Sequence, residues 1–272
     1  MSSLVKFEDH FNEKTTLVFL HGGKHIIING CQTFSTSNME SVFKEYCVPK
    51  QMRNDVREAI NSVNDEVTND DLKLIVSIYP SYLKLIANQT PEICLAAVKN
   101  DADALKFIKA QTPEICLAAV QIHGFVLRFV KEQTPDLCLA AVNENGLALD
   151  YVKEQTPEIC LAAVKNFGRA LEFVKEQTPD LCLVAVKHDG WALNFVKDQT
   201  PEICLAAMRN DGLALQYVQK QTPEICMEAV RNNCNALQFV KEQTPEICIE
   251  AVKIDGWALQ FVNDKSMVAQ IA

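Results

Sequence analysis

Eight cysteines at one fixed interval are the residues of this chain with the most obvious capacity for chemistry. They lie 22 positions apart, at Cys94, Cys116, Cys138, Cys160, Cys182, Cys204, Cys226 and Cys248. Such a series suggests a metal site or disulfides, but equivalent helices of adjacent repeats pack about 9 to 10 Å apart. A disulfide requires Cα atoms within about 7 Å, and zinc requires several ligands at about 2.3 Å. The pattern therefore predicts reduced, structural thiols inside apolar helices.

The other candidate catalytic groups are isolated. His21-Gly22-Gly23-Lys24 has the composition of an oxyanion loop, but no G-x-S-x-G nucleophile elbow accompanies it, and it lacks the spacing of a phosphate-binding loop. Two adjacent glycines between apolar runs are typical of a hairpin turn. His123 and His188 fall in variable turns without a recurring Cys or carboxylate companion. We therefore expect no enzyme, no catalytic residue, no metal and no cofactor.

An aromatic residue also recurs every 22 positions, at Phe107, Phe129, Tyr151, Phe173, Phe195, Tyr217, Phe239 and Phe261. Rings in series can stack on bases, as in helical RNA-binding repeats, but that role needs exposed rings with basic neighbours. These rings lie in an apolar frame, so we predict that they belong to the core. The formal net charge of −9 and the sequence pI of about 5.1 also disfavour nucleic acid and anionic membranes as partners.

The chain carries no obvious targeting segment. No stretch approaches the about 20 apolar residues that span a bilayer, and residues 1–10 lack the apolar run of a secretory signal. Eleven cysteines in an unsecreted chain indicate reduced thiols. We expect a cytoplasmic protein, with the host cytoplasm or the virion as the compartment if the protein is viral.

The chain contains an internal repeat, and the helices of this repeat position all these residues. Gln-Thr-Pro begins at Gln89, Gln111, Gln133, Gln155, Gln177, Gln199, Gln221 and Gln243, without insertion or deletion. In the copy at 155–176, Thr156 suits an N-cap and Pro157 the first helical position. The pattern predicts a first helix over 157–166 and a shorter second helix over about 169–176. Gly168 between them falls where a left-handed residue commonly ends a helix.

Neither helix would be stable alone, because isolated helices shorter than about 12 residues are marginal in water. Both are apolar around most of their girth, so they must bury that surface against neighbouring copies. We therefore predict an all-α solenoid over 67–272. It comprises a degenerate first repeat (67–88), eight regular repeats (89–264) and a terminal cap helix (265–272), with Ser266 in the capping position.

Four residues depart from the repeat pattern. Ala102 and Cys234 replace the glycine, which would cost about 1 kcal/mol at each if a left-handed conformation is kept. Glu228 and Glu250 replace an Ala or Val of the first helix. Either that position is exposed in every repeat, or the solenoid becomes more polar toward its end.

Residues 1–66 do not repeat. Thr15–Leu20 and Lys24–Ile28 are β-like runs on either side of the two glycines. Residues 38–46 fit a short helix, and Pro49 opens an amphipathic stretch with Met52, Val56, Ile60 and Val63 on one face. We predict a small α+β cap on the first repeat, or a dimerisation element.

The repeat pattern P-E-I-x-L-x-A-V-[KR]-x-x-G-x-A-L-x-[FY]-V, over about residues 67–264, resembles a known family. It is similar to the two-helix repeats of a domain-of-unknown-function family that is abundant in giant amoebal viruses, such as mimivirus-like viruses. The resemblance implies helical repeats and a giant-virus origin. It implies no activity and no catalytic residues.

Positions that vary between copies concentrate at the turn between the two helices and on the outer side of the second helix. They mix large aromatic side chains with acidic, basic and amide groups, as protein-binding surfaces do. The candidate partner-binding residues are His123, Phe125, Phe167, Arg169, His188, Trp191, Asp211 and Trp257. We expect a non-enzymatic protein-protein interaction scaffold with an unidentified protein partner. The alternatives are drift at exposed positions, or a structural protein that forms homo-oligomers through its N-terminal segment or the solenoid ends.

Overall fold

The computed structural model describes residues 3–9, 14–21, 24–29, 69–78, 80–86 and 88–269. The contacts within it divide the chain into two units, Met1–Ala118 and Ala119–Ala272, and each is considered by itself. The helix expected over 38–46 and the amphipathic stretch from Pro49 to Val63 lie outside the described residues. The division into a cap and a solenoid near residue 66 stays a prediction.

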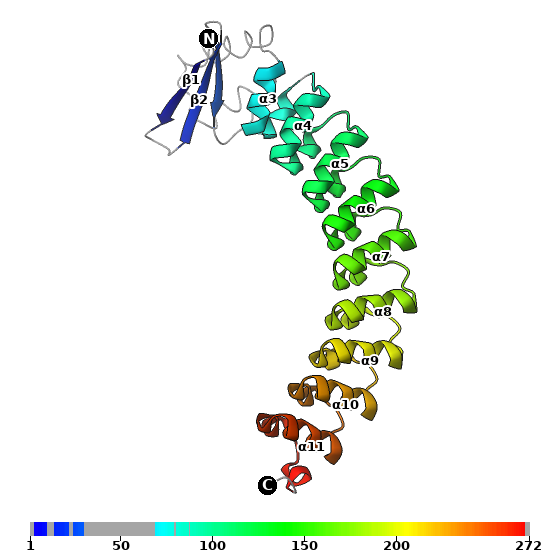
Figure 1. The fold of residues 1–272 in the computed structure, drawn as a ribbon. Coiled ribbons are helices and arrows are strands. Elements are labelled where there is room, and N and C mark those ends of the chain that lie inside the picture. Colours follow the sequence, from blue (N-terminus) through cyan, green and yellow to red (C-terminus); the bar gives the residue numbers. More distant parts are fainter. Residues whose placement is uncertain are drawn as a thin grey trace, which may run out of the picture. The chain divides into compact units, whose positions relative to one another are not determined.

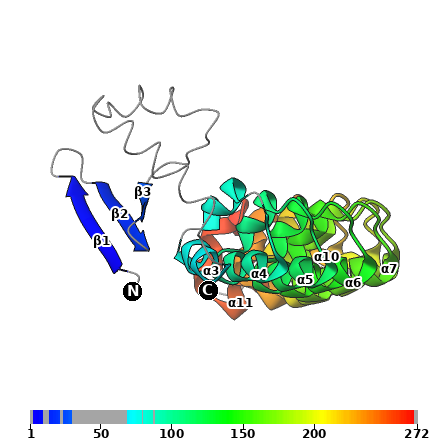
Figure 2. The same cartoon turned by 90° about the horizontal axis from the view of Figure 1, so that it is seen from above.

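The N-terminal strands form a three-stranded antiparallel sheet in the order β1-β2-β3, which Figure 2 shows. The strands are β1 (Ser3–Asp9), β2 (Lys14–His21) and β3 (Lys24–Asn29). Strands β2 and β3 pair from His21↔Lys24 to Thr16↔Asn29, on either side of the two glycines. Strand β1, which pairs with β2, was not predicted. Its apolar residues alternate only briefly, and no turn residues mark its start.

The first helix of every repeat is an α-helix of ten residues. In the unit Met1–Ala118 these are α3 (Asn69–Ile78) and α4 (Pro91–Asn100), and α5 (Pro113–Ile122) contains the division between the units. In the unit Ala119–Ala272 they are α6 (Pro135–Glu144), α7 (Pro157–Asn166), α8 (Pro179–His188), α9 (Pro201–Asn210), α10 (Pro223–Asn232) and α11 (Pro245–Ile254).

Local sequence explains where these helices begin. The Thr156 hydroxyl accepts a hydrogen bond from the Ile159 N–H, 3.3 Å away, and Pro157 occupies the first helical position. This arrangement recurs at the start of α6 and of α8 to α11, as the sequence predicts. The predicted helix 157–166 is confirmed in α7.

The second helix of each repeat is a 3₁₀ helix, a type that the pattern did not specify, and in the copy at 155–176 it covers 168–173 rather than the predicted 169–176. These six-residue helices are η1 (Pro80–Leu85), η2 (Ala102–Phe107), η3 (Gly124–Phe129), η4 (Gly146–Tyr151), η5 (Gly168–Phe173), η6 (Gly190–Phe195), η7 (Gly212–Tyr217), η8 (Cys234–Phe239) and η9 (Gly256–Phe261). In η5 the buried residues Gly168 and Leu171 are three apart, and buried Val174 follows three later as the C-cap. A 3₁₀ helix has three residues per turn, so this spacing places all three on one face.

The glycine of each repeat begins the 3₁₀ helix rather than ending the α-helix. The left-handed conformation predicted for Gly168 is wrong, because no described glycine has a positive φ in that range. The residue between the helices, Phe167, is extended, with φ of −147°. Glycine is required by close packing instead. A Cβ on Gly168 would lie 2.8 Å from the carbonyl oxygen of Ala185 in the next repeat.

The glutamine at the start of a repeat links that repeat to the preceding one through hydrogen bonds, four of them at Gln177, a role that was not predicted from the sequence. Gln177 Nε2 donates to the carbonyl of Leu171 (3.3 Å) in the preceding repeat and to that of Phe195 (2.8 Å) in its own repeat. Gln177 Oε1 accepts from the Lys197 N–H (3.0 Å) and from the Cys182 thiol (3.7 Å). Every hydrogen-bonding group of the amide is thus used.

Residues 119–269 form an all-α solenoid, as predicted. Each helix pair packs against the next, α-helix on α-helix and 3₁₀ helix on 3₁₀ helix, and α6 to α11 follow one another in chain order (Figure 1). The core repeats with the sequence: Ile159, Ala163, Val164, Ala170 and Leu171 are at most 1% exposed. No helix in the described part of the chain is long and apolar enough to span a membrane.

The two ends differ from the regular repeats. The degenerate first copy has both helices, α3 and η1, and Pro80 begins η1 where glycine begins most others. Its predicted cap Thr68 lies outside the described residues. At the other end the cap helix is the short 3₁₀ helix η10 (Lys265–Val268), and Asp264 rather than Ser266 caps it.

The position of Glu228 and Glu250 is part-exposed in the earlier repeats as well, for example at Ala162 and Val184. The sequence left open whether this position is exposed in every repeat or only toward the end of the solenoid. Exposure in nearly every repeat is the better description, although Ala206 is only 8% exposed. Each carboxylate accepts from an arginine of the preceding repeat. Arg209 Nε lies 3.0 Å from Glu228, and Arg231 Nε lies 3.0 Å from Glu250.

Candidate functional site

The variable edge lies where each α-helix ends and the 3₁₀ helix begins. Its first variable position, the last residue of the α-helix, is structural at Asn166, Asn210 and Asn232. Asn210 Oδ1 accepts from the Gly190 N–H of the preceding repeat (2.6 Å), and its Nδ2 donates to the Lys187 carbonyl (2.9 Å). Asn166 and Asn232 make the equivalent bonds. These side chains join adjacent repeats, so they are not free to contact a partner.

The second variable position caps the 3₁₀ helix. Asp189 Oδ1 accepts from the Trp191 N–H (2.9 Å), and Asp211 Oδ1 accepts from the Leu213 N–H (2.8 Å). Asn145, Asn233 and Asp255 do the same in their repeats. The preference for Asp and Asn here follows from the unpaired N–H groups at a helix start. Two of the columns that looked variable are therefore constrained by the fold.

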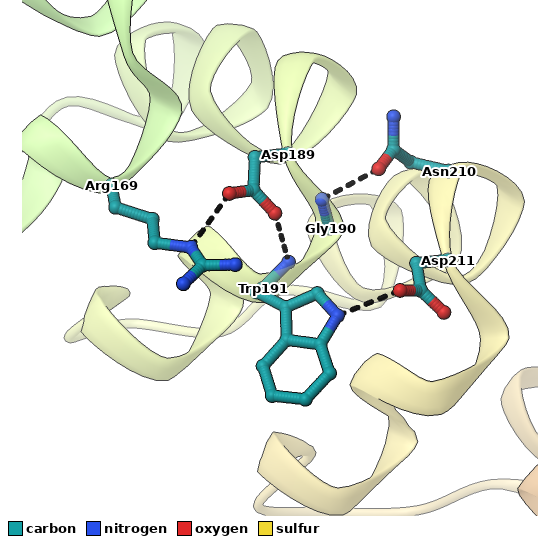
Figure 3. Close-up of polar contacts among 6 residues, drawn as sticks. All are labelled: Arg169, Asp189, Gly190, Trp191, Asn210 and Asp211. Carbon is teal, nitrogen blue, oxygen red and sulfur yellow. Dashed lines mark hydrogen bonds and ion pairs between the residues drawn. The ribbon is translucent and has the colours of Figure 1, made fainter.

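Three of the candidate residues, Arg169, Trp191 and Asp211, belong to one polar network that crosses three repeats (Figure 3). Arg169 Nε lies 2.7 Å from Asp189 Oδ2, and the guanidinium lies 5.6 Å from the centre of the Trp191 ring. Trp191 Nε1 donates to Asp211 Oδ2 over 2.6 Å, and its ring meets Tyr217 edge-on at 5.4 Å. Sequence reasoning did not select Asp189 or Tyr217. The signal that could have found them is their spacing, because Asp189 follows Arg169 by 20 residues and Tyr217 follows Trp191 by 26.

A second cluster joins His123 and Phe125 to Tyr151. The His123 and Phe125 rings are 5.5 Å apart, and Phe125 meets Tyr151 edge-on at 6.0 Å. Phe125 and Tyr151 are half-buried, whereas His123 is exposed. Each such pair contributes about 0.5–1.5 kcal/mol beyond its buried area. This is the same 26-residue offset that brings Trp191 to Tyr217.

Phe167 and His188 are not drawn into either cluster. Phe167 is half-buried at the N-cap position of η5 and makes no side-chain cap, and His188 is the exposed last residue of α8. His188 occupies the position of Asn210, but no bond from the Gly168 N–H to its side chain is present. Together with Trp257, which is also outside both clusters, the candidate residues therefore form two clusters and three separate positions, not one site.

Trp257 is the most exposed of the candidates, with 77% of its surface accessible. It lies in η9, in the position that Trp191 takes in η6, and its backbone N–H is capped by Asp255 in the same way, but its indole ring makes none of the side-chain contacts of the Trp191 ring. Ile254 (49%) and Leu259 (38%) are exposed beside it in sequence. An exposed apolar group of this kind marks a surface that another molecule can cover.

The recurring aromatic residues are half-buried, so the prediction that they belong to the core is only partly right. The chain's described core contains Leu171 and Val174 but not Phe173 between them. All eight rings, from Phe107 to Phe261, have intermediate exposure. Arg128 lies 4.5 Å from the Phe129 ring centre, in a cation–π contact. The 3₁₀ helices thus present a recurring row of rings at the molecular surface.

The first helices carry a second part-exposed apolar row. It consists of Leu95, Leu117, Leu139, Leu161, Leu183, Leu205, Met227 and Ile249. Leu117 is the most accessible of these, at 38%. This exposure could not be predicted from the pattern, because the first helix is apolar around most of its girth.

The cysteines behave as structural side chains. All nine cysteines between Cys94 and Cys248 are free and buried. Burial raises the pKa of the Cys160 thiol, and the positive charge of Lys175 opposes this effect in part. The thiol donates to Gln155 Oε1 at 3.7 Å. A raised pKa keeps the thiol neutral and unreactive. Among the residues that the structure describes, no three His, Cys, Asp or Glu side chains are placed to hold a metal ion.

Comparison with known proteins finds one family. The model described as Domain of unknown function (DUF4116) matches residues 134–178 and 200–244. Each matched segment covers about two repeats, which agrees with the resemblance to a domain-of-unknown-function repeat family. No curated protein and no solved structure matches the chain significantly.

Proposed function

We propose that the chain is a non-enzymatic scaffold that binds a protein partner along the edge formed by its 3₁₀ helices. We define this edge as the half-buried aromatic row together with the residue four positions before each ring. In residues 119–269 that second row consists of Phe125, Leu147, Arg169, Trp191, Leu213, Asn235 and Trp257. The resemblance to giant-virus repeats suggests host or viral proteins as partners.

The single observation that carries the proposal is the row of half-buried rings. Aromatic residues and arginine are enriched at protein interfaces and supply most binding hot spots. Rings that are already partly packed lose little conformational freedom on binding. Phe125 and Trp191 are held in place by Tyr151 and Tyr217, so the edge is preorganised. The leucine row on the first helices is the weaker candidate, because leucine is under-represented at hot spots.

The charges of the chain favour a protein over a nucleic acid. The formal net charge is −9, and Asp189 and Asp211 lie among the rings of the edge. Both acidic groups would repel phosphates, and the described arginine Arg169 is already paired with Asp189. An enzyme would need polar groups that converge in a pocket, whereas the polar groups of this edge bond to one another.

The test compares two arginine substitutions in one repeat. Leu213→Arg places a charge in the edge, at a position where Arg169 shows that the fold accepts arginine. Gln219→Arg adds the same charge on an exposed residue of the loop after η7. Tagged wild-type and variant chains are used for affinity purification with chemical cross-linking in the native cell, after thermal unfolding has shown that both variants fold.

We expect Leu213→Arg to lose the partner, with cross-links in the wild type mapping to the 3₁₀ helices, and Gln219→Arg to retain it. Retention of the partner by both variants, or cross-links confined to the first helices, would exclude this edge.

The alternative function, self-assembly as a structural protein, is tested by sedimentation of the purified chain at several concentrations. A concentration-dependent homo-oligomer that is lost in Leu213→Arg would identify self-assembly as the function.

A further inference from the structure

We propose that the edge of the 3₁₀ helices η6 to η9 binds a proline-rich segment in the polyproline II conformation, whose main-chain carbonyls accept from a column of amide side chains. This amide column is the residue just before each ring: Asn194, Gln216, Gln238 and Gln260. The inference rests on the proposed role of the edge in protein binding, and it names the class of segment that the edge takes.

The residue just before each ring changes from charged to amide along the solenoid. In η3 to η5 it is charged and exposed, at Arg128, Asp150 and Glu172. In η6 to η9 it is an exposed amide in every repeat. Two carboxylates lie among these rings, but Asp189 is paired with Arg169 and Asp211 accepts from the indole of Trp191. The second part of the edge therefore suits a segment without charged side chains.

A side chain in this position lies against the aromatic rings. The guanidinium of Arg128 is 4.5 Å from the centre of the Phe129 ring. In the first unit, Lys106 Nζ lies 5.0 Å from the Phe107 ring centre, and Lys84 Nζ, which is 22 residues earlier, lies 5.6 Å from the same ring. The position thus borders the ring of its own repeat and the ring of the next repeat. The amide column therefore alternates with the rings of Phe195, Tyr217, Phe239 and Phe261.

Hydrogen bonds hold the glutamines of the column in one orientation. Gln216 Nε2 donates to the Leu213 carbonyl (3.1 Å), and Gln238 Nε2 donates to the Asn235 carbonyl (2.9 Å). Each amide nitrogen has a second N–H, and within the described part of the solenoid no group bonds to it or to the Oε1 of these two residues. Two donors and two acceptors are thus fixed at the same place in successive repeats, which lowers the entropy cost of binding.

The spacing of the repeats favours polyproline II as the conformation of the partner. Equivalent helices of adjacent repeats pack about 9 to 10 Å apart, so equal groups recur along the edge at about that interval. Polyproline II has three residues per turn and rises about 3.1 Å per residue, so it presents the same face about every 9.3 Å. A β-strand repeats its face every two residues, or about 6.6 Å, and falls out of step with the rings.

Hydrogen bonding favours the same conformation. An α-helix bonds its own main-chain groups to one another and leaves none for the amide column. Polyproline II has no internal hydrogen bonds, so its carbonyls are available to accept. Proline itself has no N–H, so a proline-rich main chain offers mainly acceptors, which the second N–H of each amide matches. Aromatic-lined grooves take proline because its fixed backbone loses little freedom on binding.

RNA is the other class of ligand that rings and amides can bind, since bases stack on rings and bond to amides along their edges. The carboxylates of Asp189 and Asp211 lie among the rings and would repel its phosphates. A proline-rich segment has no such charge, so the observations favour the polypeptide.

The probe is a twelve-residue peptide of four Pro-Pro-Ala units, which spans about 37 Å in this conformation. Its control is the mirror-image peptide of D-residues, which has the same composition and the opposite helical hand. Each peptide is titrated into the full chain labelled with ¹⁵N-glutamine. The side-chain amide signals of Gln216 and Gln238 are assigned from the two single variants Gln216→Glu and Gln238→Glu.

The double variant Gln216→Glu with Gln238→Glu removes both amide donors. Its matched control is Gln121→Glu with Gln219→Glu, which makes the same change of charge at two exposed glutamines outside the edge. Thermal unfolding establishes that both double variants fold. We expect the L-peptide to shift the two amide signals and the D-peptide to leave them in place. The first double variant should bind the L-peptide about tenfold or more weakly, whereas the control variant should bind it as the wild type does.

Three results would overturn the inference: no shift at millimolar L-peptide, equal shifts with both peptides, or equal binding by the two double variants. A shift of the same signals by a uridine dodecamer but not by the L-peptide would assign the amide column to nucleic acid. Failure of this test together with loss of the partner in Leu213→Arg would reject the proline-rich class and leave the edge in place. Retention of the partner in Leu213→Arg would reject the edge itself.

Discussion

Gly190 donates its N–H to the side chain of Asn210 in the following repeat, at 2.6 Å. The two residues are 20 apart, and the same offset links Gly146 to Asn166 and Gly212 to Asn232. Glu144 replaces the asparagine for Gly124, and its carboxylate accepts from that N–H. Where glycine is replaced at Cys234, the residue 20 later is Ile254, which cannot accept a bond. The glycine and the polar residue thus occur as a pair.

The first prediction concerns this bond. Asn210→Ala removes both bonds of the side chain, so we expect the free energy of unfolding to fall by about 1–2 kcal/mol. His188→Asn places an asparagine opposite the unused Gly168 N–H, so stability should rise by about 0.5–1.5 kcal/mol. Urea unfolding of each variant beside the wild type measures both changes. A loss of stability in His188→Asn would show that the bond does not depend on this offset alone.

The second prediction concerns the paired departure at Cys234 and Ile254. Cys234→Gly alone should destabilise by about 1 kcal/mol, because glycine gains backbone freedom in the unfolded chain. Together with Ile254→Asn it gains a bond between repeats. We expect a favourable coupling energy of about 0.5–2 kcal/mol in a double-mutant cycle. Additive effects would contradict the pairing.

The third prediction separates close packing from backbone conformation. Gly190→Ala would place a Cβ 2.9 Å from the Ala207 carbonyl oxygen, so we expect a loss of about 1–3 kcal/mol. Gly256→Ala meets nothing within 4 Å and should be neutral, or stabilising by up to about 1 kcal/mol. Thermal unfolding of the two variants is the measurement. Equal losses would indicate that glycine is needed for its backbone angles after all.

The fourth prediction distinguishes the two tryptophans. Trp191→Ala removes the bond to Asp211 and the contacts with Arg169 and Tyr217, so we expect a loss of about 2–4 kcal/mol. Trp257→Ala, at 77% exposure, should change stability by less than about 0.5 kcal/mol. Chemical denaturation of the matched variants checks this. A large loss in Trp257→Ala would show that it packs within the fold.

The fifth prediction concerns the thiols. Because burial raises their pKa in the fold above the usual 9.0, the unfolded chain releases its thiol protons first as the pH rises. Stability should therefore be constant below about pH 8 and fall as the pH rises through about 9. Unfolding under reducing conditions at pH 8 and pH 10 measures the fall. It should be smaller after Cys160→Ala and Cys182→Ala, which remove two of the groups.

The native thiols should also resist labelling. Cys160 is 6% exposed and Cys182 is 3% exposed, so a thiol reagent should modify them only as fast as the protein unfolds. Fast modification of the folded chain at these positions, located by mass spectrometry, would contradict burial.

The sequence predicted the elements that depend on local signals. Thr156 and Pro157 marked the start of α7, and the period of 22 predicted the solenoid. The 3₁₀ helix was missed because Gly168, Leu171 and Val174 are too few to distinguish a period of three from one of 3.6. Gly168 was misassigned because its requirement comes from Ala185, which belongs to another repeat.

The candidate site was harder to predict because it depends on contacts between repeats. Trp191 and Trp257 occupy one column and looked equivalent, yet Asp211 satisfies the first and no described residue satisfies the second. The roles of Asn210 and Gln177 could not be predicted for the same reason, since most of their partners are backbone atoms of other segments. These contacts join residues that are 18, 20 or 26 positions apart. Comparing residues 22 positions apart, as the repeat suggests, does not reveal them.

The glutamine bonds have a consequence for how such a chain evolves. Three of the four bonds of Gln177 go to main-chain atoms, and the fourth goes to the thiol of Cys182, a residue type that recurs in every regular repeat. These contacts therefore do not depend on the side chains that vary between repeats. Gene duplication or unequal recombination can therefore add or remove a whole unit without disturbing closure. The Arg169–Asp189 pair, by contrast, is particular to one junction and would be lost on shuffling. The number of repeats can therefore change during evolution, whereas a change in their order would break the side-chain contacts that are specific to one pair of neighbours.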